Sequence, residues 1–229
     1  MKSFISAKNL GISVLSLGML MASSVQASQP NIEYLPIQAM ITAEKDGVVK
    51  IASANGRFEF RGVLIDRWAD RQILTLDDAR RAMNYIELSG VNLDQEEALM
   101  PYKFGSGPKM ITVFVDPVCQ ACATLLDDLP ENSEKYTFNV IPVGLLGEES
   151  RAIASSLACA KDQAAAKRQL KTKNFVPLEL DPSCKLDLIT RRMLTAQLLG
   201  VNGLPFMIRH DGLVSRGYPK LGLDAWLEG

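Results

Sequence analysis

The sequence predicts an α/β protein in which a small antiparallel unit precedes a larger domain built on a parallel strand-helix-strand unit. Residues 47–68 are strand-like on both sides of Asn55-Gly56, a dipeptide typical of hairpin turns because both residues tolerate positive φ. Residues 110–115 then form a continuous β-rich run that suits a buried central strand. A helical pattern over 123–129 and a second strand over 136–143 follow, and this order favours a parallel βαβ unit.

The composition is that of an ordinary globular protein. Hydrophobic residues make up 47% of the 229 residues and charged residues 22%, which excludes intrinsic disorder, collagen and coiled coils. The formal net charge is −1, so the chain lacks the basic excess of an electrostatic nucleic-acid binder, and no nucleic-acid partner is expected. Four cysteines and one histidine are left as the unusual chemical resource.

Residues 1–27 have the pattern of a cleavable signal peptide. Lys2 and Lys8 precede an uncharged apolar segment over 10–22, and Val25-Gln26-Ala27 supplies small residues at the positions that signal peptidase reads. A retained membrane anchor is the rival interpretation, but the apolar segment is shorter than the ~20 residues that a span needs. We therefore expect export to an oxidising compartment, where an even number of cysteines would pair.

The exported chain divides into a small domain, a linker and a larger domain. Thr75 with Asp78 three residues later indicates a helix start, and Gly90 would end that helix. The segment that ends in Gly105-Ser106-Gly107-Pro108 indicates an interdomain linker. The expected parts are an N-terminal domain over 28–74, a linker helix and loop over 75–109, and a second domain over 110–229. Within the second domain we also expect helices over 148–173 and 186–199, a hairpin over 206–216 and a short helix over 221–227.

The N-terminal hairpin is too small to be stable by itself. A sheet of about 20 residues cannot bury enough apolar surface alone. Pairing with a second copy of the chain would bury more, so we expect a homodimer formed through residues of about 28–75.

Cys119-Gln120-Ala121-Cys122 stands where the buried strand gives way to a helix. A thiol in the first turn of a helix faces unpaired backbone N–H groups and the positive end of the helix dipole, which favours the thiolate. Cys119 is therefore the predicted nucleophile. Cys122 lies one turn further on, within disulfide reach, and is suited to resolve a mixed disulfide formed at Cys119.

A zinc site or an inert local disulfide would use the same cysteine spacing. A zinc site would need a second close pair or added histidines, but Cys159 and Cys184 are far apart in sequence. We therefore expect no metal and no other cofactor. His210, the only histidine, belongs to an apparent surface turn, which leaves cysteine-protease chemistry without its base.

Two further features accompany the cysteine pair. Asp116, three residues before Cys119, could tune the thiol or accept a proton, or could be a turn residue ahead of Pro117. Leu204-Pro205 precedes a strand, where a proline fits the ladder poorly unless its peptide bond is cis. A cis bond would turn the Leu204 backbone outward, where it could pair with an extended substrate peptide.

These motifs together resemble the bacterial periplasmic disulfide isomerases of the DsbC and DsbG family. The resemblance is strong over residues 110–229 and looser before them. It implies a thioredoxin fold with inserted helices, preceded by a small α+β dimerisation domain and a linker helix. The matching segments are Ile111-Thr112-Val113-Phe114 leading to Asp116 and the cysteine pair, Cys159-Ala160-Lys161-Asp162, Cys184, and Leu199-Gly200-Val201-Asn202-Gly203-Leu204-Pro205 with its hairpin.

The resemblance also assigns roles to single residues. It implies that Cys119 and Cys122 are the redox pair, that Cys159 and Cys184 form a second, structural disulfide, and that Leu204 and Pro205 bind substrate. Two positions depart from the family: Leu204 stands where these isomerases usually have threonine, and Gln-Ala fills the cysteine motif in place of Gly-Tyr or Pro-Tyr.

The predicted function is that of a periplasmic thiol-disulfide isomerase that reshuffles non-native disulfides of exported proteins. Because isomerisation needs the reduced enzyme, the resemblance implies a membrane-bound thiol reductant of the DsbD type as a partner. Two alternatives stay open. A net thiol oxidase or reductase would use the same residues, and a dimeric periplasmic chaperone would have only secondary redox activity.

Overall fold

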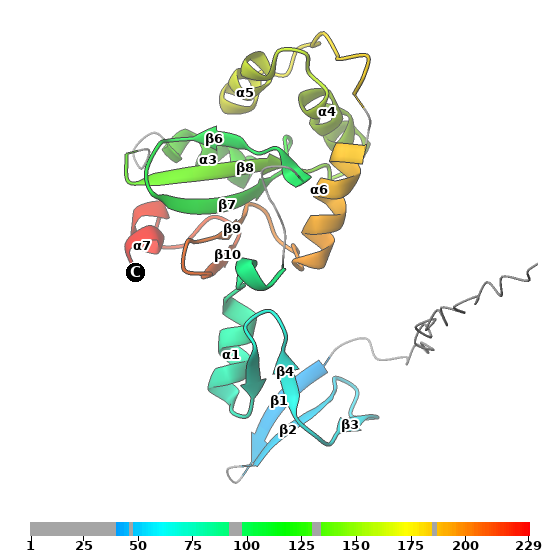
Figure 1. The fold of residues 1–229 in the computed structure, drawn as a ribbon, viewed down its shortest axis with the longest axis vertical. Coiled ribbons are helices and arrows are strands. Elements are labelled where there is room, and N and C mark those ends of the chain that lie inside the picture. The colour runs from blue at the N-terminus through cyan, green and yellow to red at the C-terminus, as the bar shows by residue number, and fades with distance from the viewer. Residues whose placement is uncertain (1–39, 46–47, 92–97, 130–133, 185–186) are drawn as a thin grey trace, which may run out of the picture. The chain divides into compact units, whose positions relative to one another are not determined.

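The computed structural model describes residues 40–45, 48–91, 98–129, 134–184 and 187–229 (Figure 1). The expected signal peptide, residues 1–27, lies outside these ranges, as do residues 28–39 of the expected N-terminal domain. Among the described residues, no helix is both long enough and apolar enough to cross a membrane.

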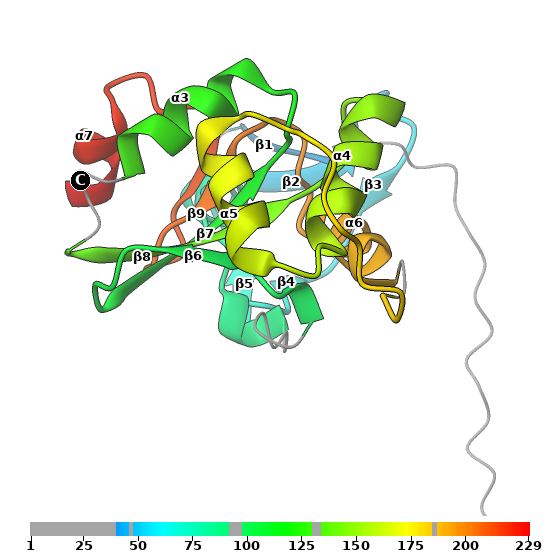
Figure 2. The same cartoon turned by 90° about the horizontal axis from the view of Figure 1, so that it is seen from above.

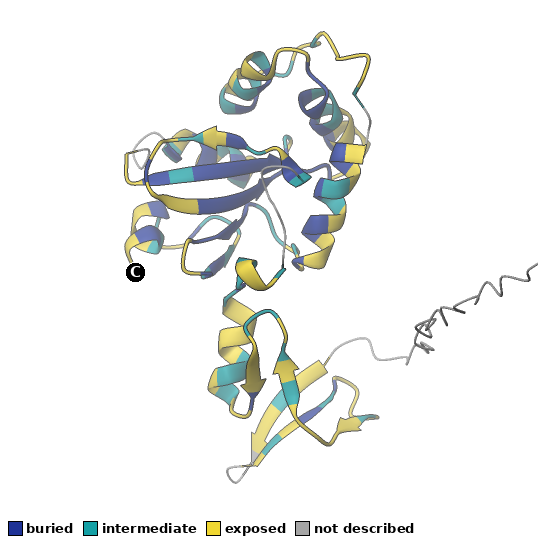
Figure 3. Cartoon of the chain, in the orientation of Figure 1, coloured by how far each residue is buried: buried dark blue, intermediate teal, exposed yellow. Residues whose placement is uncertain are grey.

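The first strands form two small antiparallel sheets. The predicted hairpin joins β2 to β3, with Gly56 at a φ of 69° in its turn. Few side chains of these strands are buried, and Figure 3 shows the contrast with the strands of the larger sheet. The strands are β1 (Met40–Lys45), β2 (Val48–Ser53) and β3 (Glu59–Phe60), in the order β1-β2-β3, and the separate pair β4 (Leu64–Asp66) and β5 (Arg71–Ile73).

The predicted helix start at Thr75 is confirmed by a full capping box at α1 (Leu76–Asn84). The Thr75 hydroxyl accepts a hydrogen bond from the Asp78 backbone N–H, and the Asp78 carboxylate accepts one from the Thr75 backbone N–H. The predicted end at Gly90 is wrong, because the chain turns extended at Tyr85 and pairs there with Leu213. Gly90 lies instead in the short 3₁₀ helix η1 (Leu88–Val91).

The larger sheet has five strands in the order β10-β9-β7-β8-β6. β7 (Lys109–Val115) and β8 (Tyr136–Pro142) are parallel, which confirms the predicted βαβ unit. β9 (Phe206–Ile208) and β10 (Val214–Arg216) form the predicted terminal hairpin, and β9 pairs antiparallel with β7. β6 (Tyr102–Phe104) lies within the range expected to be linker, yet it pairs antiparallel with β8, so the sheet begins before Met110.

Helices cover both faces of this sheet. One face packs against α3 (Gln120–Asp128), α4 (Glu148–Ala158), α5 (Gln163–Thr172) and α7 (Leu223–Glu228), and the other packs against α6 (Asp187–Leu198) and Leu99. Figure 2 shows α4 close to both α5 and α6, which it contacts. The single helical stretch expected over 148–173 is two helices, because the Asp162 side chain accepts a hydrogen bond from the Ala165 backbone N–H and starts α5.

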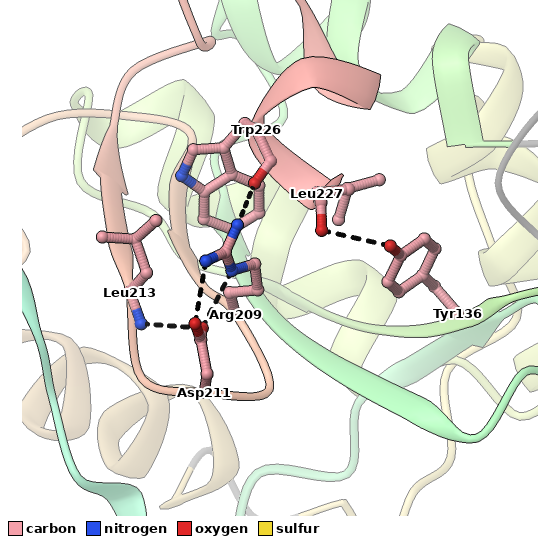
Figure 4. Close-up of polar contacts among 6 residues, drawn as sticks. All are labelled: Tyr136, Arg209, Asp211, Leu213, Trp226 and Leu227. Carbon is pink, nitrogen blue, oxygen red and sulfur yellow. Dashed lines mark hydrogen bonds and ion pairs between the residues drawn. The ribbon is translucent and has the colours of Figure 1, made fainter. Parts of the chain in front are cut away.

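Arg209 fastens the terminal hairpin to α7 (Figure 4). Its Nε and Nη2 each donate to the Asp211 carboxylate at 2.8 Å, and its Nη1 donates to the Trp226 carbonyl at 2.5 Å. The two hydrogen bonds that Arg209 donates to the carboxylate, with one from the Leu213 backbone N–H, lower the pKa of Asp211 from 3.8 to about 2. His210 is exposed in the same turn, as predicted.

The Arg209–Asp211 pair predicts a specific acid sensitivity. Because the folded-state pKa of Asp211 is depressed, the pair contributes stability that is present above pH 3.8 and is lost as the pH falls towards 2. Asp211→Asn should therefore lose less stability than the unsubstituted protein between pH 4 and pH 2. Urea unfolding of both proteins across this interval measures the difference, with Asp224→Asn as the control. Parallel stability curves would contradict the prediction.

Candidate active site

Cys119 stands at the junction of a buried strand and a helix, where the sequence predicts it. β7 ends at Val115, the chain turns through residues 116–118, and Cys119 is the N-cap residue of α3. The Cys119 Sγ accepts a hydrogen bond of 3.2 Å from the backbone N–H of Cys122. An acceptor at this position faces the unpaired N–H groups of the first helical turn, and these groups stabilise negative charge.

The structure joins Cys119 to Cys122 in a disulfide, with their Cα atoms 5.2 Å apart. The two sulfurs differ in access. Cys122 is 1% exposed and belongs to the core cluster between the sheet and α3, whereas Cys119 is only half-buried at the edge of that cluster. An external sulfur can therefore approach Cys119 and not Cys122.

Asp116 is a buried anchor for the turn that precedes Cys119. Its Oδ1 accepts a hydrogen bond from the Val118 backbone N–H at 3.1 Å, and its own carbonyl accepts one from the Cys119 N–H. Its Oδ2 accepts from the backbone N–H groups of Leu145 and Leu146, at 2.8 and 3.0 Å, and from the Ser150 hydroxyl. Of the two interpretations of this residue, the geometry favours the turn residue, because these donors engage both carboxylate oxygens.

Leu204 and Pro205 lie at the same end of the sheet as the cysteine pair. Phe206 at the start of β9 pairs with Phe114 near the end of β7, so the residues before Phe206 and those after Phe114 meet at one edge. The Leu204-Pro205 peptide bond is cis, as expected, and the Pro205 carbonyl accepts a hydrogen bond of 2.8 Å from the Gly217 N–H.

Cys159 and Cys184 are joined in a second disulfide, with Cα atoms 5.4 Å apart. Cys159 ends α4, and its carbonyl accepts a hydrogen bond from the Asp181 N–H, so the bridge ties the segment between α5 and α6 to the end of α4. Within the described ranges, no group of three or more His, Cys, Asp or Glu residues is placed to hold a metal ion.

The loop that follows β8 belongs to the site, although the sequence-based predictions do not include it. Gly144-Leu145-Leu146-Gly147 connects β8 to α4, and its backbone binds the same carboxylate as the Cys119 turn. A signal was present in the sequence, because the carboxyl ends of neighbouring parallel strands meet at one edge and commonly carry binding loops there. Two consecutive leucines between glycines at such a position are unusual for a solvent-exposed connection.

The topology and the position of the cysteine pair define a thioredoxin-like fold. A βαβ unit (β7, α3, β8) is followed by a ββα unit (β9, β10, α7), and the four strands share one sheet in the order β10-β9-β7-β8. The cysteine pair opens the first helix of this arrangement, and a cis proline immediately precedes the third strand. A Cys-x-x-Cys motif beside a βαβ unit is typical of thioredoxin-like redox proteins.

Comparison with known proteins finds similarity in solved structures. No protein-family model and no curated protein matches the chain. A disulfide interchange protein from Neisseria gonorrhoeae is similar over 59% of this chain and 96% of its own, with a TM-score of 0.47 and 22% identity. A thioredoxin-like oxidoreductase from Silicibacter pomeroyi has the same coverage, with a TM-score of 0.48 and 17% identity. A periplasmic thioredoxin-like protein from Salmonella enterica serovar Typhimurium is similar over 58% of this chain and 93% of its own, with a TM-score of 0.44 and 18% identity.

Proposed function

We propose that the protein is a thiol-disulfide oxidoreductase in which Cys119 is the nucleophile and Cys122 the resolving cysteine. The observation that carries this proposal is the difference between the two sulfurs: Cys119 caps α3 and is accessible, whereas Cys122 is 1% exposed. In the reduced protein the helix start would favour the Cys119 thiolate, which is the form that attacks a disulfide. The buried Cys122 would react only with the sulfur of Cys119, once that sulfur is bound to a substrate sulfur in a mixed disulfide.

The reaction conserves thiols and disulfides at each step. The Cys119 thiolate attacks one sulfur of a substrate disulfide, forms a mixed disulfide and releases the other substrate sulfur as a thiolate. In isomerisation, another thiolate of the substrate then attacks the substrate sulfur that is bonded to Cys119. A new substrate disulfide forms, and Cys119 leaves as the thiolate without net oxidation. Alternatively, the Cys122 thiolate attacks the Cys119 sulfur, which releases a reduced substrate and leaves the Cys119–Cys122 disulfide.

We propose further that the physiological reaction is isomerisation in the periplasm, on misoxidised exported proteins. This reaction needs the reduced cysteine pair, so the proposal includes a membrane-bound thiol reductant of the DsbD type. A homodimer formed through the N-terminal domain is part of the same proposal. Its support is the exposed apolar surface on the small sheets, where Met40, Ile41, Val48, Phe60 and Ile65 are between 44% and 56% exposed.

Refolding of a scrambled multi-disulfide protein tests the proposed function. The reduced protein should restore the native pairing, and Cys119→Ser should reduce the rate to that of the uncatalysed reaction because it removes the nucleophile. Cys122→Ala should retain part of the activity and accumulate mixed disulfides on Cys119, which mass spectrometry of the trapped adducts can identify.

Companion measurements separate the alternatives. Oxidation of a reduced substrate without rescue of the scrambled one would overturn isomerisation in favour of a net oxidase. A protein with both Cys119→Ser and Cys122→Ser that still suppresses aggregation and complements a deletion strain would favour the chaperone. The dimer is measured separately, by sedimentation of the full exported chain, and a monomer would contradict it.

A further inference from the structure

The loop between β8 and α4 exposes two consecutive leucines beside the cysteine pair. Leu145 is 39% exposed and Leu146 is 55% exposed. Val118, the residue before Cys119, is 42% exposed. Large apolar side chains that are exposed singly are common on protein surfaces, but a contiguous group of them next to a reactive site commonly marks a binding surface.

Hydrogen bonds and close packing fix this loop. The backbone N–H groups of Leu145 and Leu146 both donate to the Asp116 Oδ2. A Cβ atom on Gly144 would lie 2.4 Å from the Cα atom of Arg151, so the loop packs directly on the first turns of α4. The exposure of the two leucines is therefore built into the fold and does not arise from a loose connection.

The Asp116 carboxylate also places the loop next to the nucleophile. Its Oδ1 accepts from the Val118 N–H, one residue before Cys119, while its Oδ2 accepts from the Leu145 N–H. One carboxylate group thus lies within 3.1 Å of both backbone nitrogens. The Val143 N–H also donates to the Val115 carbonyl at 2.8 Å, so the two chain segments run side by side up to this point. We call Val118, Leu145 and Leu146 the apolar lip.

The lip continues into a hollow along α6. Leu145 and residues of α6 line a hollow of about 440 Å³, and its α6 wall includes Ile189, Met193 and Leu194. Leu194 is itself 59% exposed, so the apolar surface extends beyond the loop. Among the described residues that line this hollow, Arg151 is the one with a charged side chain.

We propose that the apolar lip determines substrate specificity, by selecting polypeptides in which a large apolar side chain lies next to the cysteine that Cys119 attacks. The inference rests on the proposed function, because the mixed disulfide brings the substrate chain to Cys119 and so brings its neighbouring residues to the lip. Burial of an apolar side chain against Leu145 and Leu146 removes apolar surface of both partners from water. The positive charge of Arg151 disfavours a lysine or arginine at the same place and tolerates an acidic group.

A peptide series tests the proposal with a single readout. Each peptide carries one cysteine, blocked as a mixed disulfide with 2-nitro-5-thiobenzoate and flanked on both sides by leucine, serine or lysine. The full exported chain with Cys122→Ala is used reduced, so that the Cys119 thiolate attacks the peptide sulfur and releases one equivalent of the coloured thiolate. Rates are normalised to that with 5,5′-dithiobis(2-nitrobenzoate), a disulfide with no peptide to contact the lip.

The leucine peptide should react roughly tenfold faster than the serine peptide, the usual scale for one additional apolar contact in a specificity site, and the lysine peptide should be slowest. Leu145→Ser with Leu146→Ser should reduce the leucine-to-serine ratio to near one. Leu180→Ser is the matched control, since Leu180 is a similarly exposed leucine (51%) in the segment between α5 and α6, and it should keep the ratio.

The outcomes distinguish the two proposals. If neither the small disulfide nor any peptide reacts, the proposed function fails. If all peptides react at one rate while the small disulfide also reacts, the thiol chemistry stands and the specificity proposal is overturned. Loss of the leucine preference in the control variant as well as in the lip variant would also overturn it.

Discussion

Replacing Asp116 with alanine is expected to lower the free energy of unfolding by about 4 kcal/mol, because it leaves several buried donors without an acceptor. Asp116 is 2% exposed, and its two oxygens accept hydrogen bonds from three backbone N–H groups and from Ser150. For a chain of this length, a loss of this size corresponds to a decrease in melting temperature of roughly 10 °C. Thermal and urea unfolding of the reduced and the oxidised protein measure it.

Two further substitutions show how much of this loss of stability depends on the charge of Asp116 and on a single donor. Asp116→Asn keeps the shape but turns an NH₂ group towards donors that need an acceptor, so its cost should approach that of alanine. Ser150→Ala removes one of the four donors and leaves the carboxylate the other three, so it should cost only about 1 kcal/mol. Asp181→Asn, at an exposed turn, is the control and should be close to neutral. Equal stability of the Asp116→Ala and unsubstituted proteins would refute the role of this carboxylate.

The parts of the site that follow from local sequence could be predicted, and those that depend on distant partners could not. Cys119 and Cys122 are found where a β-rich run gives way to a helical pattern, because strand and cap preferences act over a few residues. The donors that surround the Asp116 carboxylate include groups 29 to 34 residues away. Nothing near Asp116 in the sequence indicates those donors, so the sequence alone does not distinguish a turn residue from a group that tunes the thiol.

The same distinction explains the differences in the fold. The capping box at Thr75 is local and was predicted, whereas the helix stops early because Tyr85 pairs with Leu213, more than a hundred residues further on. β6 has only three residues, and its partner β8 makes it a strand. Asn139 is a polar residue at a position where an apolar one would be expected. It is completely buried in β8 among apolar residues, and within the described residues its side-chain amide has no hydrogen-bond partner. Tertiary structure overrides local preference at each of these positions.

Arg192 shows how a tertiary role can leave no trace in the sequence. It lies on α6 and is 1% exposed, although arginine is among the residues that are rarely fully buried. Its Nε donates to the Leu99 carbonyl at 2.9 Å and its Nη2 donates to the Met100 carbonyl at 2.8 Å. Burial lowers the pKa of Arg192 to about 10, so the guanidinium is still protonated at neutral pH. In the described part of the chain, its Nη1 is buried without a partner.

Replacing Arg192 with alanine should therefore destabilise the protein by about 3–5 kcal/mol, since it opens a cavity and leaves two carbonyls without donors. Arg192→Met separates the contribution of packing from that of the hydrogen bonds, because methionine fills most of the volume but carries no charge and no donors. A smaller loss of stability for methionine than for alanine would assign part of the effect to packing. The neighbouring Arg191→Ala is the matched control. Arg191 is only half-buried: it pairs with Asp187 at the surface, and its Nε donates to the Ala98 carbonyl at 3.0 Å. Its loss should therefore cost about 1 kcal/mol, clearly less than the loss of the buried Arg192. Leu99 and Met100 lead directly into β6, the edge strand that pairs with β8. If Arg192→Ala lowered the free energy of unfolding by less than about 1 kcal/mol, strand pairing alone would hold this edge of the sheet, and the buried guanidinium would not be needed.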